Sequence, residues 1–345
     1  MNDQKKLNLL FTSAGRRSYL IKYFQNALAG SGTVHAANSS EISTALQAAD
    51  QSVITPLIYD REYIPFLLRY CRENEITAVI PLFDIDLPVL ARHRKEFDKV
   101  GTRLIVADSR IVDICNDKWK TFQFLKENGF AVPSTYIRLS EAETALDEGA
   151  MQFPVIIKPR WGMGSIAVWE AEDEQELRVL YYKVKREIFR LYLKFESEAD
   201  MEGSVLIQEK IPGQEYGLDV ICDLDGNYCT TIPKKKGGMR SGETDYAQII
   251  EAPELEAVGK RIALLTRHAA DMDVDVFISD RNIYILEMNA RFGGGYPFSH
   301  TAGADLPLAV VKWLRGETVD SRILTPRAGV MAQKDISMMK LLPTP

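Results

Sequence analysis

The N-terminal third of the chain alternates short runs of apolar and β-branched residues with longer amphipathic stretches. The apolar runs have the length of buried strands, and the stretches between them repeat their apolar residues at helical spacing. This pattern predicts strands at 7–12, 33–38, 76–82 and 103–108, and helices at about 18–29 and 61–73. Strands separated by helices of this length form βαβ units with a parallel sheet. We therefore expect an α/β domain over residues 1–112.

The pattern changes after a helical stretch, KWKTFQFLKEN, that ends at Gly129. Short apolar runs now follow one another with Gly, Pro, Asp or Asn between them, as in hairpins: PVIIKP, IAVWEA, SVLIQEKI, GLDVICD, YCTTIPKK, VDVFI and IYILEMN. Such runs predict an α+β arrangement with antiparallel sheet. We place two further units at 113–204 and 205–345. A basic stretch at 176–195 has the spacing of a solvated amphipathic helix.

Composition narrows the class of protein. The 345 residues are 46% hydrophobic and 26% charged, which is ordinary for a globular chain, and the formal net charge of −6 argues against binding nucleic acid through its phosphates. Four scattered cysteines form no CxxC pair and indicate reduced thiols and a cytoplasmic protein. No apolar run is long enough for a signal peptide or membrane span. With four histidines at no zinc-binding spacing, any metal should be a hard, oxygen-ligated ion.

The segment VDVFISDRNIYILEMNARFGGG contains the strongest chemical signal. If 280–282 form a three-residue hairpin loop, Asp275 lies directly opposite Glu287 on the neighbouring strand. Asn289 shares their face, because side chains alternate along a strand. Two carboxylates on one face of an apolar sheet repel each other unless a cation lies between them. The segment therefore predicts a Mg²⁺ site, the alternative being acids on a solvent-facing edge.

Two further segments have the composition of nucleotide contacts. In PVIIKPRWGMGSIAV, Lys158 ends an apolar strand and the loop 162–165 is rich in small residues, so that backbone N–H groups can approach a phosphate. In SVLIQEKIPGQEYGLDVI, a strand, a Pro-Gly turn and Glu215 could offer edge groups to a base and a ribose. Each segment alone is equally well explained as a plain hairpin.

The first strand-to-helix turn, FTSAGRRSYL, places Gly15, Arg16 and Arg17 where a helix N-terminus favours an anion. It lacks the three glycines of a dinucleotide-binding turn, and the second strand ends at Asn38 rather than at an acid. These absences oppose an NAD-linked oxidoreductase. The two arginines either meet an anionic substrate or are simply solvated.

Taken in order, these motifs resemble the ATP-grasp superfamily, in particular the ATP-binding half of carbamoyl-phosphate synthase large chains and the single-unit ligases related to them. The resemblance implies a pre-ATP-grasp α/β domain at 1–112, a small subdomain at 113–204 and a C-terminal subdomain with the metal site at 205–345. It implies an ADP-forming carboxylate–amine ligase that uses ATP with Mg²⁺ or Mn²⁺ and proceeds through an acyl phosphate. Small-molecule carboxylates and amines would be its partners, and the assembly state, with a homodimer as one option, stays open.

The resemblance also assigns roles to individual residues. ATP would be held by Lys118, Lys158, Gly162, Gly164, Ser165, Glu209, Ile211 and Glu215, the metal by Asp275, Glu287 and Asn289, and the transferred phosphoryl group by Arg291 and Arg240. The synthase has glutamine and histidine where this chain has Asp275 and Arg240, and it needs two ATP-grasp units where this chain has one. Carbamoyl phosphate is therefore not the expected product. An ATP-binding regulatory protein without turnover remains the main alternative, and His300 is expected to be structural.

Overall fold

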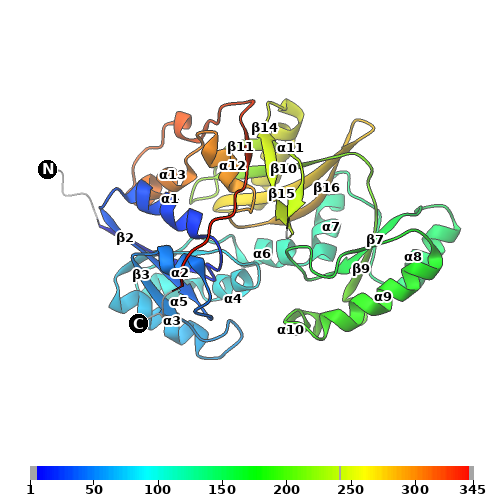
Figure 1. The fold of residues 1–345 in the computed structure, drawn as a ribbon, viewed down its shortest axis with the longest axis horizontal. Helices are drawn as coiled ribbons and strands as arrows, with labels where there is room; N and C mark the ends of the chain where they lie inside the picture. The colour runs from blue at the N-terminus through cyan, green and yellow to red at the C-terminus, as the bar shows by residue number, and fades with distance from the viewer. Residues whose placement is uncertain (1–5, 241, 342–345) are drawn as a thin grey trace.

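A five-stranded parallel sheet forms the N-terminal domain of the computed structural model, which describes residues 6–240 and 242–341 (Figure 1). The strand order is β3-β2-β1-β4-β5, with β1, β2 and β4 at the centre. The predicted parallel sheet is confirmed. The edge strand β3 was not predicted, and none of its four residues is buried: two are exposed and two are half-buried. The elements are β1 (Leu7–Thr12), α1 (Ser18–Leu28), β2 (Gly32–Asn38), α2 (Thr44–Ala48), β3 (Gln51–Ile54), α3 (Tyr63–Glu73), β4 (Ile76–Pro81), α4 (Asp86–Arg92), α5 (Arg94–Lys99), β5 (Arg103–Leu104) and α6 (Ser109–Asn116).

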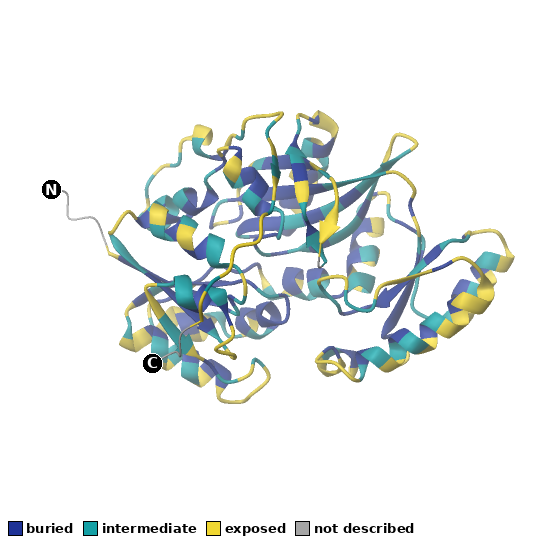
Figure 2. Cartoon of the chain, viewed as in Figure 1, coloured by how far each residue is buried: buried dark blue, intermediate teal, exposed yellow. Residues whose placement is uncertain are grey.

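The next unit is a four-stranded antiparallel sheet of order β6-β9-β7-β8, which has a hydrophobic core of its own. Its longest helix lies on the outside of the molecule, and Figure 2 shows one face of that helix exposed. Strand β9 belongs to this sheet, so the unit continues through Glu209, past the boundary predicted at 204. The elements are α7 (Lys118–Glu127), β6 (Thr135–Tyr136), α8 (Leu139–Asp147), β7 (Val155–Pro159), β8 (Trp169–Ala171), α9 (Glu174–Ile188), α10 (Lys194–Ser197) and β9 (Val205–Glu209).

The C-terminal unit contains a six-stranded antiparallel sheet of order β16-β15-β10-β11-β14-β17. Two buried clusters include residues of both this sheet and the N-terminal domain, so these two units share their core. The elements are β10 (Gln214–Cys222), β11 (Tyr228–Lys236), β12 (Met239–Arg240), β13 (Glu243–Thr244), β14 (Tyr246–Ile249), α11 (Pro253–Thr266), β15 (Ala270–Ser279), β16 (Asn282–Asn289), α12 (Tyr296–Thr301), α13 (Leu306–Leu314), the 3₁₀ helix η1 (Ser321–Leu324) and β17 (Met331–Gln333).

The β15–β16 hairpin has the predicted pairing but not the predicted turn. Ser279 pairs with Asn282, so the loop has two residues, both with positive φ, instead of three. A bulge at Leu286 on β16 then shifts the register by one residue and restores the pairing of Asp275 with Glu287. The expected facing pair is therefore confirmed, and the three-residue loop is wrong.

No helix within residues 6–240 and 242–341 has the length and apolarity needed to cross a membrane.

Candidate functional site

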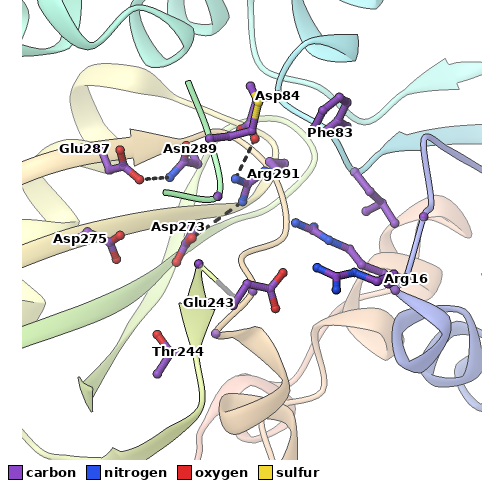
Figure 3. A pocket seen from close by; sticks show the side chains of 18 of the residues that line it. Arg16, Phe83, Asp84, Glu243, Thr244, Asp273, Asp275, Glu287, Asn289 and Arg291 are labelled. Atoms are coloured by element: carbon purple, nitrogen blue, oxygen red, sulfur yellow. Dashed lines mark hydrogen bonds and ion pairs between the residues drawn. The ribbon is translucent and has the colours of Figure 1, made fainter. Parts of the chain in front are cut away.

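Two adjoining cavities lie where the three units meet. We call the one between the small sheet and strands β10, β15 and β16 the inter-sheet cavity, with a volume of about 410 Å³. The other, of about 340 Å³, faces the N-terminal domain, and we call it the junction cavity (Figure 3). Both volumes suit a small molecule. Asp275 and Glu287 line both cavities, so the two spaces meet at the predicted metal site.

All eight residues predicted to contact ATP line the inter-sheet cavity. One helix, three sheet strands and two loops bring them together although they are spread over almost a hundred positions of the chain. They are Lys118, Lys158, Gly162, Gly164, Ser165, Glu209, Ile211 and Glu215.

Two lysines enter this cavity from different elements. Lys118, at the start of α7, donates a hydrogen bond to the Gly162 carbonyl at 2.6 Å and pairs with Glu287 at 3.0 Å. Lys158 at the end of β7 donates to the Gln208 side chain at 2.8 Å. Burial lowers the pKa of Lys158 to about 8, against the opposing attraction of Glu287. The cavity thus places two cations beside a glycine-containing loop.

A second loop approaches the glycine-containing loop closely. Gly242 has φ +77°, and a Cβ atom there would lie 2.2 Å from the Gly164 carbonyl oxygen. Only glycine allows this approach without a shift of the backbone. The segment around β12 and β13 therefore lies against the loop that borders both cavities.

The remaining predicted ATP contacts have neighbours of their own. The Glu209 carboxylate accepts a hydrogen bond from the Ser134 N–H at 3.0 Å, and Ile211 is buried. Glu215 pairs with Lys236 at 2.8 Å. Burial raises the pKa of Glu215, while Lys236 opposes this rise. The inter-sheet cavity thus has an acid at the start of β10 and apolar walls that include Ile211, Phe277 and Leu286.

The predicted metal ligands form a row on one face of the hairpin (Figure 3). Asn289 donates to the Glu287 carboxylate at 3.4 Å, and Asp275 pairs with Lys236. Burial raises the pKa of Asp275 to about 6 despite Lys236. Burial also tends to raise the pKa of Glu287. The attraction of Lys118 and Lys158 is stronger than this effect, and the pKa of Glu287 is lowered to about 2.

Two charged residues of this row were missed from the sequence. Asp273 lies opposite Asn289 in the strand register of the hairpin. It is two residues before Asp275, so the two side chains share the same face. Lys236, at the end of β11, lies within ion-pair distance of both Asp275 and Glu215. The alternation of side chains along a strand could have placed both residues on this face.

The donor set fits a magnesium ion that completes its shell with phosphate oxygens. Among the described residues, no group of three or more His, Cys, Asp or Glu side chains could hold a metal by itself. The three predicted ligands, Asp275, Glu287 and Asn289, instead offer two carboxylates and one amide, all hard oxygen donors. Mg²⁺ is commonly bound in this way, by one or two carboxylates together with the phosphates of a substrate.

The two predicted catalytic arginines lie in different surroundings. Arg291 lines the junction cavity and pairs with Asp84 at 2.9 Å and with Asp273 at 3.8 Å. Arg240 lines neither cavity, although its neighbour Met239 lines both. Its guanidinium pairs with Asp245 and donates to the Lys334 carbonyl at 2.8 Å. The structure therefore brings Arg291, but not Arg240, to the row of acids.

The N-terminal arginines also reach the site. Arg16 and Arg17 line the junction cavity, and Arg17 donates to the Phe292 carbonyl at 2.6 Å. His300 lines neither cavity and stacks on Tyr23 with 3.7 Å between ring centroids, as expected of a structural residue.

Family models and known proteins match nearly the whole chain. Residues 9–105 match the PylC-like N-terminal domain, and residues 115–295 match the ATP-grasp domain. The carbamoyl phosphate synthase large chain of Campylobacter jejuni is 24% identical over 284 residues, which are 79% of this chain and 24% of that protein. The chain thus spans about a quarter of the length of this relative.

Solved structures share the fold. An L-amino acid ligase from Bacillus licheniformis has a TM-score of 0.66 at 19% identity, over 94% of this chain and 78% of that one. The second structure is the biotin carboxylase domain of 2-oxoglutarate carboxylase from Hydrogenobacter thermophilus, in complex with MgADP and bicarbonate. It has a TM-score of 0.72 at 17% identity, and the match covers 92% of this chain and 71% of that one. Because the ATP-grasp model covers more than half of its length, the chain belongs to the ATP-grasp family.

Proposed function

We propose that the protein is an ATP-dependent carboxylate–amine ligase that forms an amide through an acyl phosphate and releases ADP and phosphate. One observation supports this proposal above all: Asp275 and Glu287 line both cavities. A nucleotide in the inter-sheet cavity and an acceptor in the junction cavity would meet at these carboxylates. In-line transfer of a phosphoryl group needs this arrangement.

In the inter-sheet cavity, the apolar walls would hold the base and Glu215 would accept hydrogen bonds from the ribose. Lys118 and Lys158 would bind the phosphates, because both already lie beside the glycine-containing loop. Each lysine has a protein partner, Glu287 or Gln208, that a bound phosphate would replace or share.

Asp275, Glu287 and Asn289 would hold Mg²⁺, which when bound neutralises phosphate charge and orients the transferred group. Arg291 would stabilise the negative charge that develops on the phosphoryl oxygens, since its guanidinium is fixed by Asp84 beside the row. Arg240 would need to leave Asp245 to take part, and its catalytic role stays a proposal.

An acyl phosphate hydrolyses unless water is excluded from it. The contact of Gly242 with Gly164 lies at the border of the two cavities, so this loop pair would limit the access of water. The acceptor is the bound carboxylate itself, and the amine then displaces phosphate from the acyl group.

We propose that the two substrates are a small-molecule carboxylate and a small-molecule amine. The solved structures that share the fold include an L-amino acid ligase. Pairs of amino acids are therefore a sensible first screen for this chain.

The test is a screen for ADP release with Mg²⁺ and ATP, followed by mass measurement of the products. Release of ADP together with an amide, and only when both substrates are present, supports the ligase. An ATP-binding regulatory protein would bind the nucleotide and release no ADP with any pair. Matched assays with Glu287→Gln protein separate turnover at this site from a contaminating ATPase.

A further inference from the structure

The charges that line the junction cavity are balanced except at the N-terminal turn. Every lining carboxylate and three of the five lining cations lie within ion-pair distance of an opposite charge. These pairs are Asp84 and Asp273 with Arg291, Asp275 with Lys236, Glu287 with Lys118, Glu243 with Lys334, and Lys234 with Asp219. Within the part of the chain that the structure describes, Arg16 and Arg17 form no ion pair.

These two arginines differ in how they are held. Arg17 donates to the Phe292 carbonyl at 2.6 Å, and Arg291 donates to the same carbonyl at 3.2 Å. The Arg17 guanidinium is therefore fixed at the cavity by a neutral carbonyl. The nearby Glu243 carboxylate attracts both arginines but forms its ion pair with Lys334. Arg16 is exposed and has no hydrogen bond to any described residue, so all of its donors are free for a ligand.

The turn also lies at the place where open parallel sheets bind ligands. Residues 13–17 follow β1 and residues 82–84 follow β4, and both segments line the cavity. Strands β1 and β4 are neighbours, and the connections from them run in opposite directions along the sheet, to β2 and to β5. The crevice beyond the carboxyl ends of two such strands is the usual ligand site of this architecture.

We propose that Arg16 and Arg17 bind an anionic group of the acceptor substrate, a carboxylate or phosphate distinct from the carboxylate that is phosphorylated. This inference rests on the proposed ligase function and names its substrate class: an acid with a second negative group. In Figure 3, Arg16 extends into the cavity from the side opposite Asp275, Glu287 and Asn289. One end of the substrate would thus lie at the arginines while its reacting carboxylate reaches the row of acids.

The junction cavity also has apolar walls, which suit the carbon skeleton of a substrate. Leu82, Phe83 and Phe298 line the same cavity and offer apolar surface to the middle of a ligand. A guanidinium binds carboxylate and phosphate alike, in a planar geometry with two hydrogen bonds. The contacts of the two arginines therefore set the charge of the second group but not its identity.

The test is calorimetric titration with two probes, glutarate and inorganic phosphate, at low ionic strength, where screening is weak. The protein is titrated both free and saturated with the magnesium complex of a β,γ-imido ATP analogue, so that the phosphate-binding lysines are occupied in one arm. We expect at least one probe to bind the nucleotide-loaded protein. Tighter binding of glutarate would identify a second carboxylate, and tighter binding of phosphate a phosphorylated substrate.

Arg16→Ala should weaken the binding of the tighter probe by about tenfold or more, the effect of losing charge-assisted hydrogen bonds. The variant should fold normally, because the Arg16 side chain has no hydrogen-bond partner to lose. Arg61→Ala, which removes an exposed arginine of the same domain, is the matched control and should bind as the original protein does.

Two results would overturn the inference: neither probe binds the loaded protein, or Arg16→Ala binds as tightly as Arg61→Ala. Failure of the ATP analogue to bind would instead contradict the proposed function. In that case the titrations of the free protein still decide whether the arginines form an anion site.

Discussion

Lys236 is the positive charge that stabilises the ionised forms of Asp275 and Glu215. Its removal should destabilise the protein in a pH-dependent way. Its side chain is 9% exposed and lies beside Asp275 and Glu215. Even with Lys236 present, burial raises the pKa of Asp275 from the usual 3.8 to about 6. A pKa difference of this size corresponds to about 3 kcal/mol of unfolding free energy that is lost when the carboxyl is charged.

The sign follows from proton uptake. Between pH 3.8 and pH 6 the folded protein holds the Asp275 proton more tightly than the unfolded chain does, so stability decreases as the pH rises through this range. Lys236→Met removes the main charge that opposes this effect and raises the pKa further. We expect a further loss of up to about 2 kcal/mol at pH 7.5, because the Asp275 carboxyl of the original protein ionises above pH 6 while that of the variant stays protonated. At pH 5, where Asp275 is protonated in both proteins, most of this difference should disappear.

Thermal unfolding followed by circular dichroism measures the effect, with Tm expected to decrease by roughly 3 °C at pH 7.5. Lys235→Met is the matched control, because Lys235 is the adjacent residue of β11 and is exposed. The reasoning is refuted if the two variants are equally stable at pH 7.5, or if Lys236→Met loses the same stability at pH 5 as at pH 7.5.

The remaining predictions concern the nucleotide and metal. ATP should bind much more weakly in EDTA than in Mg²⁺, because Asp275 and Glu287 then face the triphosphate as like charges; equal Kd values by calorimetry would contradict the metal site. Glu287→Gln should abolish ADP formation in a folded protein, whereas Glu215→Ala should mainly raise the KM for ATP, and identical kinetic defects would refute this division. Because burial lowers the pKa of Lys158 to about 8, the Kd for ATP should increase above pH 8, and Lys158→Met should remove this dependence.

The row formed by Asp275, Glu287 and Asn289 was predictable because side chains alternate regularly along a strand and the turn between the two strands is short. Pairing by two-residue alternation brought Asp275 opposite Glu287 although the assumed loop was one residue too long. The bulge at Leu286 compensated for that error, and nothing in the local sequence indicates a bulge of this kind. The eight residues predicted to contact ATP were selected through the family resemblance, and the structure places all of them around one cavity.

Other features depend on contacts between distant segments, which no local pattern reports. Strand β9 joins the small sheet by pairing with β7, so the unit extends beyond the boundary drawn from turn signals. The family resemblance assigned Arg240 to the phosphoryl group, but its pairing with Asp245 follows from how the surrounding loop folds. Arg16 and Arg17 have no ion pair among residues 6–240 and 242–341, and the pairs that occupy the other cavity charges come from all three units of the chain.

The most direct test of phosphoryl transfer to a carboxylate is an isotope measurement with the substrate pair that the ADP screen identifies. The carboxylate is labelled with ¹⁸O, and the released inorganic phosphate is analysed by mass spectrometry. An acyl phosphate predicts one labelled oxygen in each phosphate, because a carboxylate oxygen leaves with the phosphoryl group, and it predicts ADP without AMP or pyrophosphate. Unlabelled phosphate beside a genuine amide product, or the appearance of AMP and pyrophosphate, would contradict this mechanism.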